Sequence, residues 1–145
     1  MVEKSSTGNI SFDGFASSLG IVITAVSKNH VSGTMPIDDS KRQPFGYMHG
    51  GATLAFLETI ASVGGEYNCD TSTHRPFGYE VCVRHLKGAK SGTLHGEAEF
   101  DKVEGNKYYW NVVATDDVGD IISKGYIVIK LVSLERLAEI EAKYK

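Results

Sequence analysis

Residues 50–63 read GGATLAFLETIASV, and this stretch decides the fold. Its apolar residues recur at helical spacing, it contains no proline, and its own glycines fall in the first turn. The pattern predicts a helix of about four turns, with Gly64 and Gly65 as its C-terminal stop. Because nearly every side of this helix is apolar, we expect it to be buried.

Apolar or alternating stretches on both sides of the helix favour β-strands, two before it and four after it. The predicted strands are residues 21–26, 31–37, 78–87, 93–100, 107–115 and 121–132. Turn-forming residues separate most of them. An antiparallel meander packed around one helix is the simplest arrangement, which makes the expected fold class α+β.

The two ends of the chain have their own patterns. Residues 1–10 are polar, and we expect them to fray. Residues 11–19 predict a short turn or helix that places Phe12 and Phe15 on an apolar surface. Residues 133–145 can form an amphipathic C-terminal helical extension.

Length and composition limit the class of protein. The 145 residues have the size of one domain, so residues 1–145 are treated as a single domain. The charged fraction of 23% and the hydrophobic fraction of 41% are typical of a globular chain. No apolar run reaches the ~20 residues that a membrane span needs, and the first residues lack the apolar core of a signal peptide.

Charge and cysteine content exclude further classes. A net charge of −3 gives no bulk attraction to nucleic acid. Cys69 and Cys82 are too few for a disulfide framework or a four-ligand zinc site. We therefore expect a cytoplasmic protein with reduced thiols and no metal, and with neither membrane nor nucleic acid as a partner.

A single carboxylate, Glu58, lies in the middle of the apolar helix. Burying a lone charge is costly unless the charge is paired, neutralised or used in chemistry. Ser62, four residues later, shares its helix face. The pattern leaves two interpretations open, a structural hydrogen bond at a wet edge or a functional carboxylate.

The start of the helix offers a second chemical group. His49, Gly50 and Gly51 stand where the first backbone N–H groups are free and where the positive end of the helix dipole favours an oxyanion. Glycine allows a ligand to approach this backbone closely. The alternative is an ordinary glycine-rich helix entry with His49 as its cap.

Gly50 and Glu58 are separated along the helix. Eight positions correspond to about 12 Å, so the two cannot touch one carbonyl carbon from within one chain. If both are catalytic, Glu58 must come from a second subunit, and a two-fold dimer with two shared sites follows.

Residues 43–62, QPFGYMHGGATLAFLETIAS, resemble the hotdog-fold acyl-CoA thioesterases. The branch in question includes the 4-hydroxybenzoyl-CoA, 1,4-dihydroxy-2-naphthoyl-CoA and phenylacetyl-CoA thioesterases. The chain matches the family pattern at Gln43, His49, Gly50, Glu58 and Ser62. The resemblance continues weakly from about residue 15 to 131. It implies a hotdog fold, in which a long central helix is wrapped by a curved antiparallel sheet, here of about six strands.

The resemblance implies a role for each matched residue. The Gly50 N–H would polarise the thioester carbonyl, and Gln43 and His49 would help to hold it. Glu58 of a partner subunit would act as nucleophile or general base, and Ser62 would orient that carboxylate or the water. The implied reaction is hydrolysis of an acyl-CoA, with an aromatic acyl group, by a homodimer that often pairs into a tetramer. No cofactor is implied, because CoA is part of the substrate.

The binding of CoA is implied by position only. The candidate residues are Gly78, His85, Lys87, Gly88, Gly105, Asn106 and Lys107. Lys87, Lys102 and Lys107 suit the CoA phosphates, although ordinary solvated lysines fit the pattern equally well. The family usually has Asn-Ala-Asn-His where this chain has Cys82-Val83-Arg84-His85, and Ser-Arg where it has Gly105-Asn106-Lys107. These departures leave open how CoA is held and which acyl group fits.

Two other functions remain open at this stage. One is a non-catalytic hotdog domain that binds or senses acyl-CoA, because a fold does not define an activity. The other is a hotdog dehydratase or hydratase in which His49 and Glu58 face a hydroxyacyl chain. Ester binding without hydrolysis would favour the first, and hydration of an enoyl thioester would favour the second.

Overall fold

The computed structural model describes residues 14–144. It contains six strands and four helical segments. The strands are β1 (Val22–Val26), β2 (His30–Pro36), β3 (His74–His85), β4 (Thr93–Glu104), β5 (Lys107–Thr115) and β6 (Ile121–Ser133). The helices are α1 (Phe15–Ser18), the 3-10 turn η1 (Asp39–Lys41), α2 (Gly50–Tyr67) and α3 (Leu134–Ala142).

The expected order of two strands, one long helix and four strands is therefore confirmed. The C-terminal helical extension is present as α3. The predicted fraying of residues 1–10 and the predicted packing of Phe12 lie outside the described residues.

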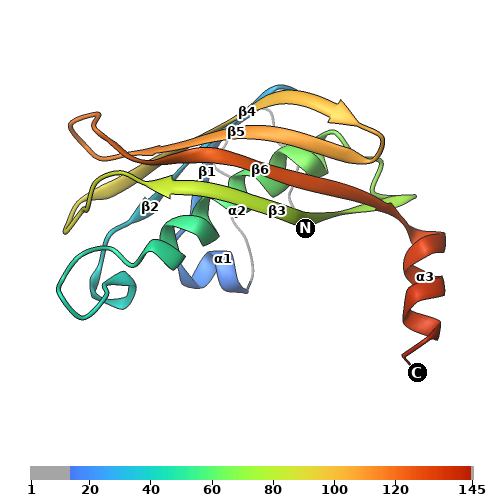
Figure 1. Ribbon diagram of the computed structural model, residues 1–145, viewed down its shortest axis with the longest axis horizontal. Helices are drawn as coiled ribbons and strands as arrows, with labels where there is room; N and C mark the ends of the chain where they lie inside the picture. The colour runs from blue at the N-terminus through green and yellow to red at the C-terminus, as the bar shows by residue number, and fades with distance from the viewer. Residues whose placement is uncertain (1–13, 145) are drawn as a thin grey trace.

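The six strands form one antiparallel sheet in the order β1-β2-β4-β5-β6-β3. The simple meander was a wrong expectation, because β3 pairs with β6 at the far edge instead of joining β4. The physical reason is the course of α2, which lies across the sheet and contacts all six strands. Figure 1 shows α2 behind the layer of strands, so the chain reaches the edge opposite β1 before β3 begins.

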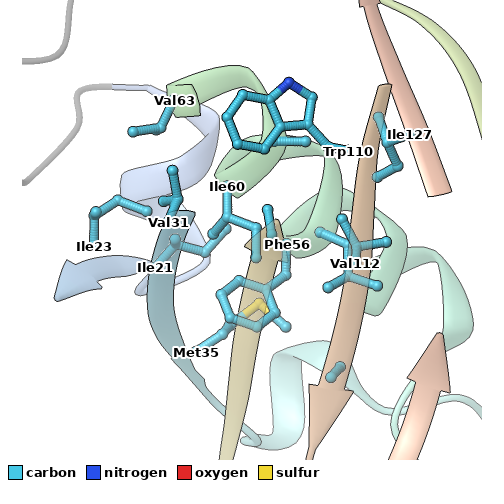
Figure 2. Packing of buried hydrophobic residues seen from close by; sticks show 14 of the residues in the cluster. Ile21, Ile23, Val31, Met35, Phe56, Ile60, Val63, Trp110, Val112 and Ile127 are labelled. Atoms are coloured by element: carbon cyan, nitrogen blue, oxygen red, sulfur yellow. The ribbon is translucent and has the colours of Figure 1, made fainter. Parts of the chain in front are cut away.

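The core lies between the sheet and one face of α2. Phe56 and Ile60 of α2 pack against Met35, Trp110 and Val112 of the strands, as Figure 2 shows. Burial of such side chains stabilises the fold by about 1.5–3 kcal/mol each. The further buried residues include Ile21, Ile23, Val31, Leu57, Val63, Leu94, Ala98, Ile127 and Ile129.

The expectation that α2 is buried on every side is wrong for the single chain. Leu54, Ala55, Glu58 and Ser62 are only half-buried, because one sheet covers one face of the helix. This apolar but half-covered face is continuous with the carboxylate of Glu58.

The predicted stop at Gly64 and Gly65 is also wrong, because α2 continues through both to Tyr67. A methyl group built on Gly64 would lie 2.5 Å from Trp110 Cη2, and one on Gly65 would lie 2.6 Å from Ile129 Cγ2. These glycines bring the helix close to the sheet and are not its terminus.

Two peripheral segments complete the fold. Phe15 is 61% exposed, so most of its side chain remains outside the apolar core. Figure 1 shows α3 projecting from the end of the sheet, where Ser133 Oγ caps it by accepting the Arg136 N–H at 3.1 Å. Among residues 14–144, no helix has both the length and the apolar character that a bilayer crossing requires.

Candidate active site

The first turn of α2 presents one backbone donor without an acceptor. His49 caps the helix, since its Nδ1 accepts the Gly51 N–H at 2.8 Å. The His49 carbonyl accepts the N–H groups of Ala52 and Thr53. Residues 14–144 supply no acceptor for the Gly50 N–H, which an α-helix leaves unbonded at this position. The Gly50 N–H therefore lies unpaired at the positive end of the helix dipole.

The loop before α2 is held by its own hydrogen bonds. Gln43 Oε1 accepts the N–H groups of Phe45 and Tyr47 at 2.5 and 3.4 Å. The Gln43 N–H donates to the Tyr47 carbonyl at 2.8 Å. Gln43 thus closes the turn through its side-chain oxygen and its backbone N–H.

A buried lysine supports the same loop. The Lys41 carbonyl accepts the His49 N–H at 2.7 Å. The side chain of Lys41 is 2% exposed, and its Nζ lies 2.7 Å from Asp38 Oδ2. The hydrogen bond from Lys41, together with that from Ser40, lowers the pKa of Asp38 from 3.8 to about 2. This ion pair fixes the backbone that leads into the helix N-terminus.

His85, at the end of β3, lies beside that N-terminus. A methyl group at Gly50 would be 2.7 Å from His85 Nε2. The other ring nitrogen, Nδ1, is hydrogen-bonded to the fully buried Ser123 Oγ at 2.7 Å. Sequence reasoning had implied a CoA contact for His85 and had missed Ser123. The only signal for Ser123 was a polar residue within the apolar strand 121–132.

Glu58 lies further along α2, against Gly78 of β3. Any side chain at Gly78 would collide with the Glu58 Oε1, so the glycine makes room for the carboxylate. Ser62, one turn later, is half-buried on the same helix face. Because α2 is continuous from Gly50 to Tyr67, Gly50 and Glu58 stay about 12 Å apart. One chain does not bring the two together.

The residues implied for CoA binding form two separate groups. His85, Lys87 and Gly88 lie near the N-terminus of α2, where the ring of Tyr47 covers Gly88. Lys87 Nζ contacts Asp116 at 3.0 Å and Asp120 at 2.6 Å. The hydrogen bonds that Lys87 donates to Asp120 and Asp116 raise the pKa of Lys87.

The second group is the turn between β4 and β5. The Asn106 carbonyl accepts the Leu131 N–H at 2.8 Å, which ties the turn to β6. Lys107 Nζ lies 4.4 Å from the centre of the Tyr79 ring, and Lys102 is 3.1 Å from Glu104. Gly105 has φ 62°, a left-handed backbone that suits glycine. This group lies at the opposite end of β6 from Ser123 and His85.

Two hollows of the described part of the chain lie away from these groups. A hollow of about 410 Å³ on the sheet is lined by His30, Glu97, Asn111 and Lys124. A second, of about 300 Å³, borders Asn68, His74 and Asn106. Neither is lined by Gly50 or Glu58. Within the described part of the chain, no three His, Cys, Asp or Glu side chains gather as a metal site.

Comparison with known proteins gives a consistent family. Residues 45–122 match the Thioesterase superfamily. The Bacillus subtilis protein ComA2 is 42% identical over 81 residues, which are 56% of this chain and 64% of that relative. The 1,4-dihydroxy-2-naphthoyl-CoA hydrolase of Escherichia coli is 30% identical over 101 residues, 70% of this chain and 74% of the relative.

A solved structure agrees with the fold. The crystal structure of a mutant of the thioesterase PA1618 from Pseudomonas aeruginosa superposes with a TM-score of 0.80 at 27% identity. The match covers 84% of this chain and 88% of that one.

Proposed function

The chain belongs to the Thioesterase superfamily and has the hotdog fold, and on that premise we propose that it hydrolyses acyl-CoA thioesters at a site shared by two subunits. One observation carries this proposal. An unbonded N–H at the start of α2 and a carboxylate two turns later are the two groups that thioester hydrolysis needs. Their separation along one rigid helix requires the second group to come from another subunit.

The edge strand β3 is the surface on which we propose that two subunits meet. It is twelve residues long, and among the strands of residues 14–144 it pairs only with β6, which leaves its other side as a sheet edge. Phe77, Tyr79 and Val81 are 46%, 53% and 39% exposed along this edge. A long, apolar, unpaired edge favours pairing with another strand, and a two-fold axis would join β3 to itself.

Charge and symmetry select the register of this pairing. Directly opposed residues of an antiparallel pair project from the same face of the sheet. A two-fold axis perpendicular to the sheet keeps every residue on its own face, so a residue cannot oppose the copy of its chain neighbour. The axis must therefore pass beside one residue of the regular segment 80–85, which then faces its own copy. An axis at Cys82 places Glu80 opposite the partner's Arg84, and Arg84 opposite the partner's Glu80. An axis at Val81 would place Glu80 opposite the partner's Cys82, and an axis at Val83 would place Arg84 opposite the partner's Cys82. Arg84 has no ion-pair partner among residues 14–144.

The same register assembles the catalytic groups. A bulge between Gly78 and Glu80 shortens the strand by one residue, so Gly78 falls next to the partner's His85. Glu58 lies against Gly78, and the partner's His85 lies against the partner's Gly50. Two independent requirements, opposite charges and opposed catalytic groups, therefore support one arrangement.

The chemistry then follows from the shared site. The partner's Gly50 N–H stabilises the oxyanion that forms on the thioester oxygen. Glu58 either removes a proton from water, whose oxygen attacks the carbonyl carbon, or attacks that carbon itself to give a mixed anhydride that water opens. In both routes the C–S bond breaks, CoA leaves as a thiolate that takes up a proton, and the acid is released. Ser62 is positioned to orient the carboxylate or the water.

The substrate class is also a proposal. The E. coli relative is named for a naphthoyl-CoA, which supports an aromatic acyl group. In the paired register, the turn Gly105–Lys107 of one subunit approaches the segment of the partner that contains Lys87 and Gly88. The two groups proposed to hold CoA meet only in the dimer, and pairing of dimers into a tetramer remains a further proposal, as does a cytoplasmic location.

Thiol release from a panel of aryl and fatty acyl-CoAs tests the proposal. Glu58→Gln and Glu58→Ala should each lower kcat by at least about 10²-fold with folding intact. Glu66→Gln, which alters another carboxylate of α2, should retain activity. Unchanged activity in the Glu58 variants would exclude the proposed role, and tight binding of every ester without thiol release would favour the acyl-CoA-binding module.

A single turnover in ¹⁸O-labelled water separates the two routes. Label found in Glu58 by mass spectrometry would identify it as the nucleophile. Label found only in the released acid, with none in the protein, would mean that water attacked the acyl carbon, as the general-base route requires. In a separate assay, hydration of an enoyl-CoA would instead favour the dehydratase or hydratase class.

A further inference from the structure

The helix α3 has an apolar stripe that residues 14–144 cover only in part, since Leu137 and Ile140 are half-buried and Leu134 is exposed. Leu134, Leu137 and Ile140 recur at helical spacing and share one side. Leu134 is 37% exposed, and none of the nine residues of α3 is buried. Of the neighbouring elements, α3 packs mainly on β6, from which it emerges.

The root of α3 is fixed at one end of the edge strand. Ser133 pairs with His74, the first residue of β3, and the Leu134 N–H donates to the Thr73 carbonyl at 2.9 Å. In Figure 1, α3 projects from this end of the sheet and extends to the side where α1 and the loop before α2 also lie. That loop is at the other end of the molecule, beyond the His85 end of β3.

The proposed dimer brings these two ends together. With the two-fold axis at Cys82 and the bulge at residue 79, His74 of one subunit falls beside the partner's Ala89. The root of α3 therefore lies next to the segment 86–90 of the other subunit. This inference rests on the proposed function, since it uses the same axis.

The surface at that place is apolar and well anchored. Phe45, Leu86 and Tyr47 are 83%, 57% and 43% exposed. The loop 43–48 is fastened to the segment 86–90, because the Met48 N–H donates to the Ala89 carbonyl at 2.7 Å. Arg42 Nη2 also donates to the Lys90 carbonyl at 2.7 Å.

Charge complements this contact. Of the two lysines in the segment 86–90, Lys87 already pairs with Asp116 and Asp120, whereas Lys90 has no ion-pair partner among residues 14–144. The segment 134–142, which forms α3, contains three glutamates and one arginine. Of the glutamates of α3, Glu141 shares the side of the apolar stripe, seven residues after Leu134, and its charge suits Lys90 beside the exposed Tyr47 ring.

We propose that α3 of each subunit packs its apolar stripe on the partner's loop 43–48 and borders the entrance of the partner's active site. Each site is then built from two chains: the loop 43–48 and the start of α2 come from one subunit, and α3, β3 and the part of α2 that contains Glu58 come from the other. Because Gln43 closes this loop, α3 acts on substrate binding by holding the loop in place. Residues of α3 are positioning residues and take no part in bond breaking.

Cross-linking tests the contact directly. In a Cys82→Ser background, Leu137→Cys combined with Phe45→Cys should give covalent dimers with a short bis-maleimide. Leu137→Cys combined with Thr24→Cys, which is exposed on the opposite edge strand β1, is the matched control and should not. Absence of the Leu137–Phe45 product, while Cys82 of the unmodified protein cross-links two subunits, would overturn the inference and leave the dimer intact.

A kinetic measurement supplies the second readout. Leu137→Glu with Ile140→Glu should raise KM for the acyl-CoA about tenfold and change kcat by less than about threefold. Glu135→Gln with Glu139→Gln, on the other side of α3, should leave both constants unchanged. An unchanged KM in the stripe variant would overturn the inference, whereas loss of the Glu58 effect on kcat would overturn the proposed function.

Discussion

Gly50 and His85 are in such close contact that a methyl group on the glycine would lie 2.7 Å from the histidine Nε2. The contact joins the helix N-terminus to the end of the edge strand, which are 35 residues apart in the chain. Ser123 holds the far side of the same imidazole ring. The space next to the unbonded Gly50 N–H is thus defined by a histidine whose orientation is set from β6.

Gly50→Ala should lower kcat about 10²-fold, because displacement of His85 or of the helix start by about 1 Å misplaces the oxyanion donor. The double variant Gly50→Ala with His85→Ala removes the collision. In this double variant, kcat should be less than about threefold below that of His85→Ala alone. Steady-state thiol release measures all three proteins, and fully multiplicative effects would rule out the contact as the cause.

Glu80→Lys should weaken the dimer about tenfold, because it places like charges opposite each other at two symmetric positions. The charge swap Glu80→Lys with Arg84→Glu should restore association. Analytical ultracentrifugation measures the dissociation constant. Glu97→Lys, on β4 and away from β3, is the control that should leave it unchanged.

Mild oxidation of the native protein should link two subunits through Cys82, the residue proposed to lie on the axis. Cys69 is buried, and Cys82 is exposed. Non-reducing electrophoresis should therefore show a dimer that disappears in Cys82→Ser. A dimer that persists in that variant would place the axis elsewhere.

Gly64→Ala should destabilise the protein by about 1–3 kcal/mol, although alanine is the better helix former by about 1 kcal/mol. The added methyl group would lie 2.5 Å from the fully buried ring of Trp110, which has no space to retreat. Urea unfolding checks the sign. A stabilised variant would mean that the glycine is a helix defect and not a packing site.

Asp38→Asn should lower stability at neutral pH and have a smaller effect in acid. The folded pKa of Asp38, about 2, lies below its ordinary value of 3.8 because Lys41 and Ser40 donate hydrogen bonds to the carboxylate. The charged carboxylate therefore makes its full contribution to the free energy of unfolding above pH 4, and this contribution is lost as the pH falls toward 2. Urea unfolding of both proteins at pH 6 and pH 2.5 tests this, and an equal difference at the two values would contradict it.

The expected glycine stop shows where local signals fail. Gly64 and Gly65 carry the sequence pattern of a helix end, yet α2 passes through them because Trp110 and Ile129 occupy the space of their missing side chains. Those two residues are far away in the sequence. No local pattern distinguishes a glycine that ends a helix from one that allows close packing.

The amino-acid sequence alone establishes the element types and order, because helical and alternating periodicities are local properties of the chain. It also determined the catalytic candidates Gln43, His49, Gly50, Glu58 and Ser62, which lie within twenty consecutive residues. Only the tertiary structure decided that β3 is the sheet edge, that Gly78 accommodates Glu58 and that His85 lies beside Gly50. These relationships depend on which strands become neighbours, and strand pairing arises from packing of the whole core across residues distant in the chain.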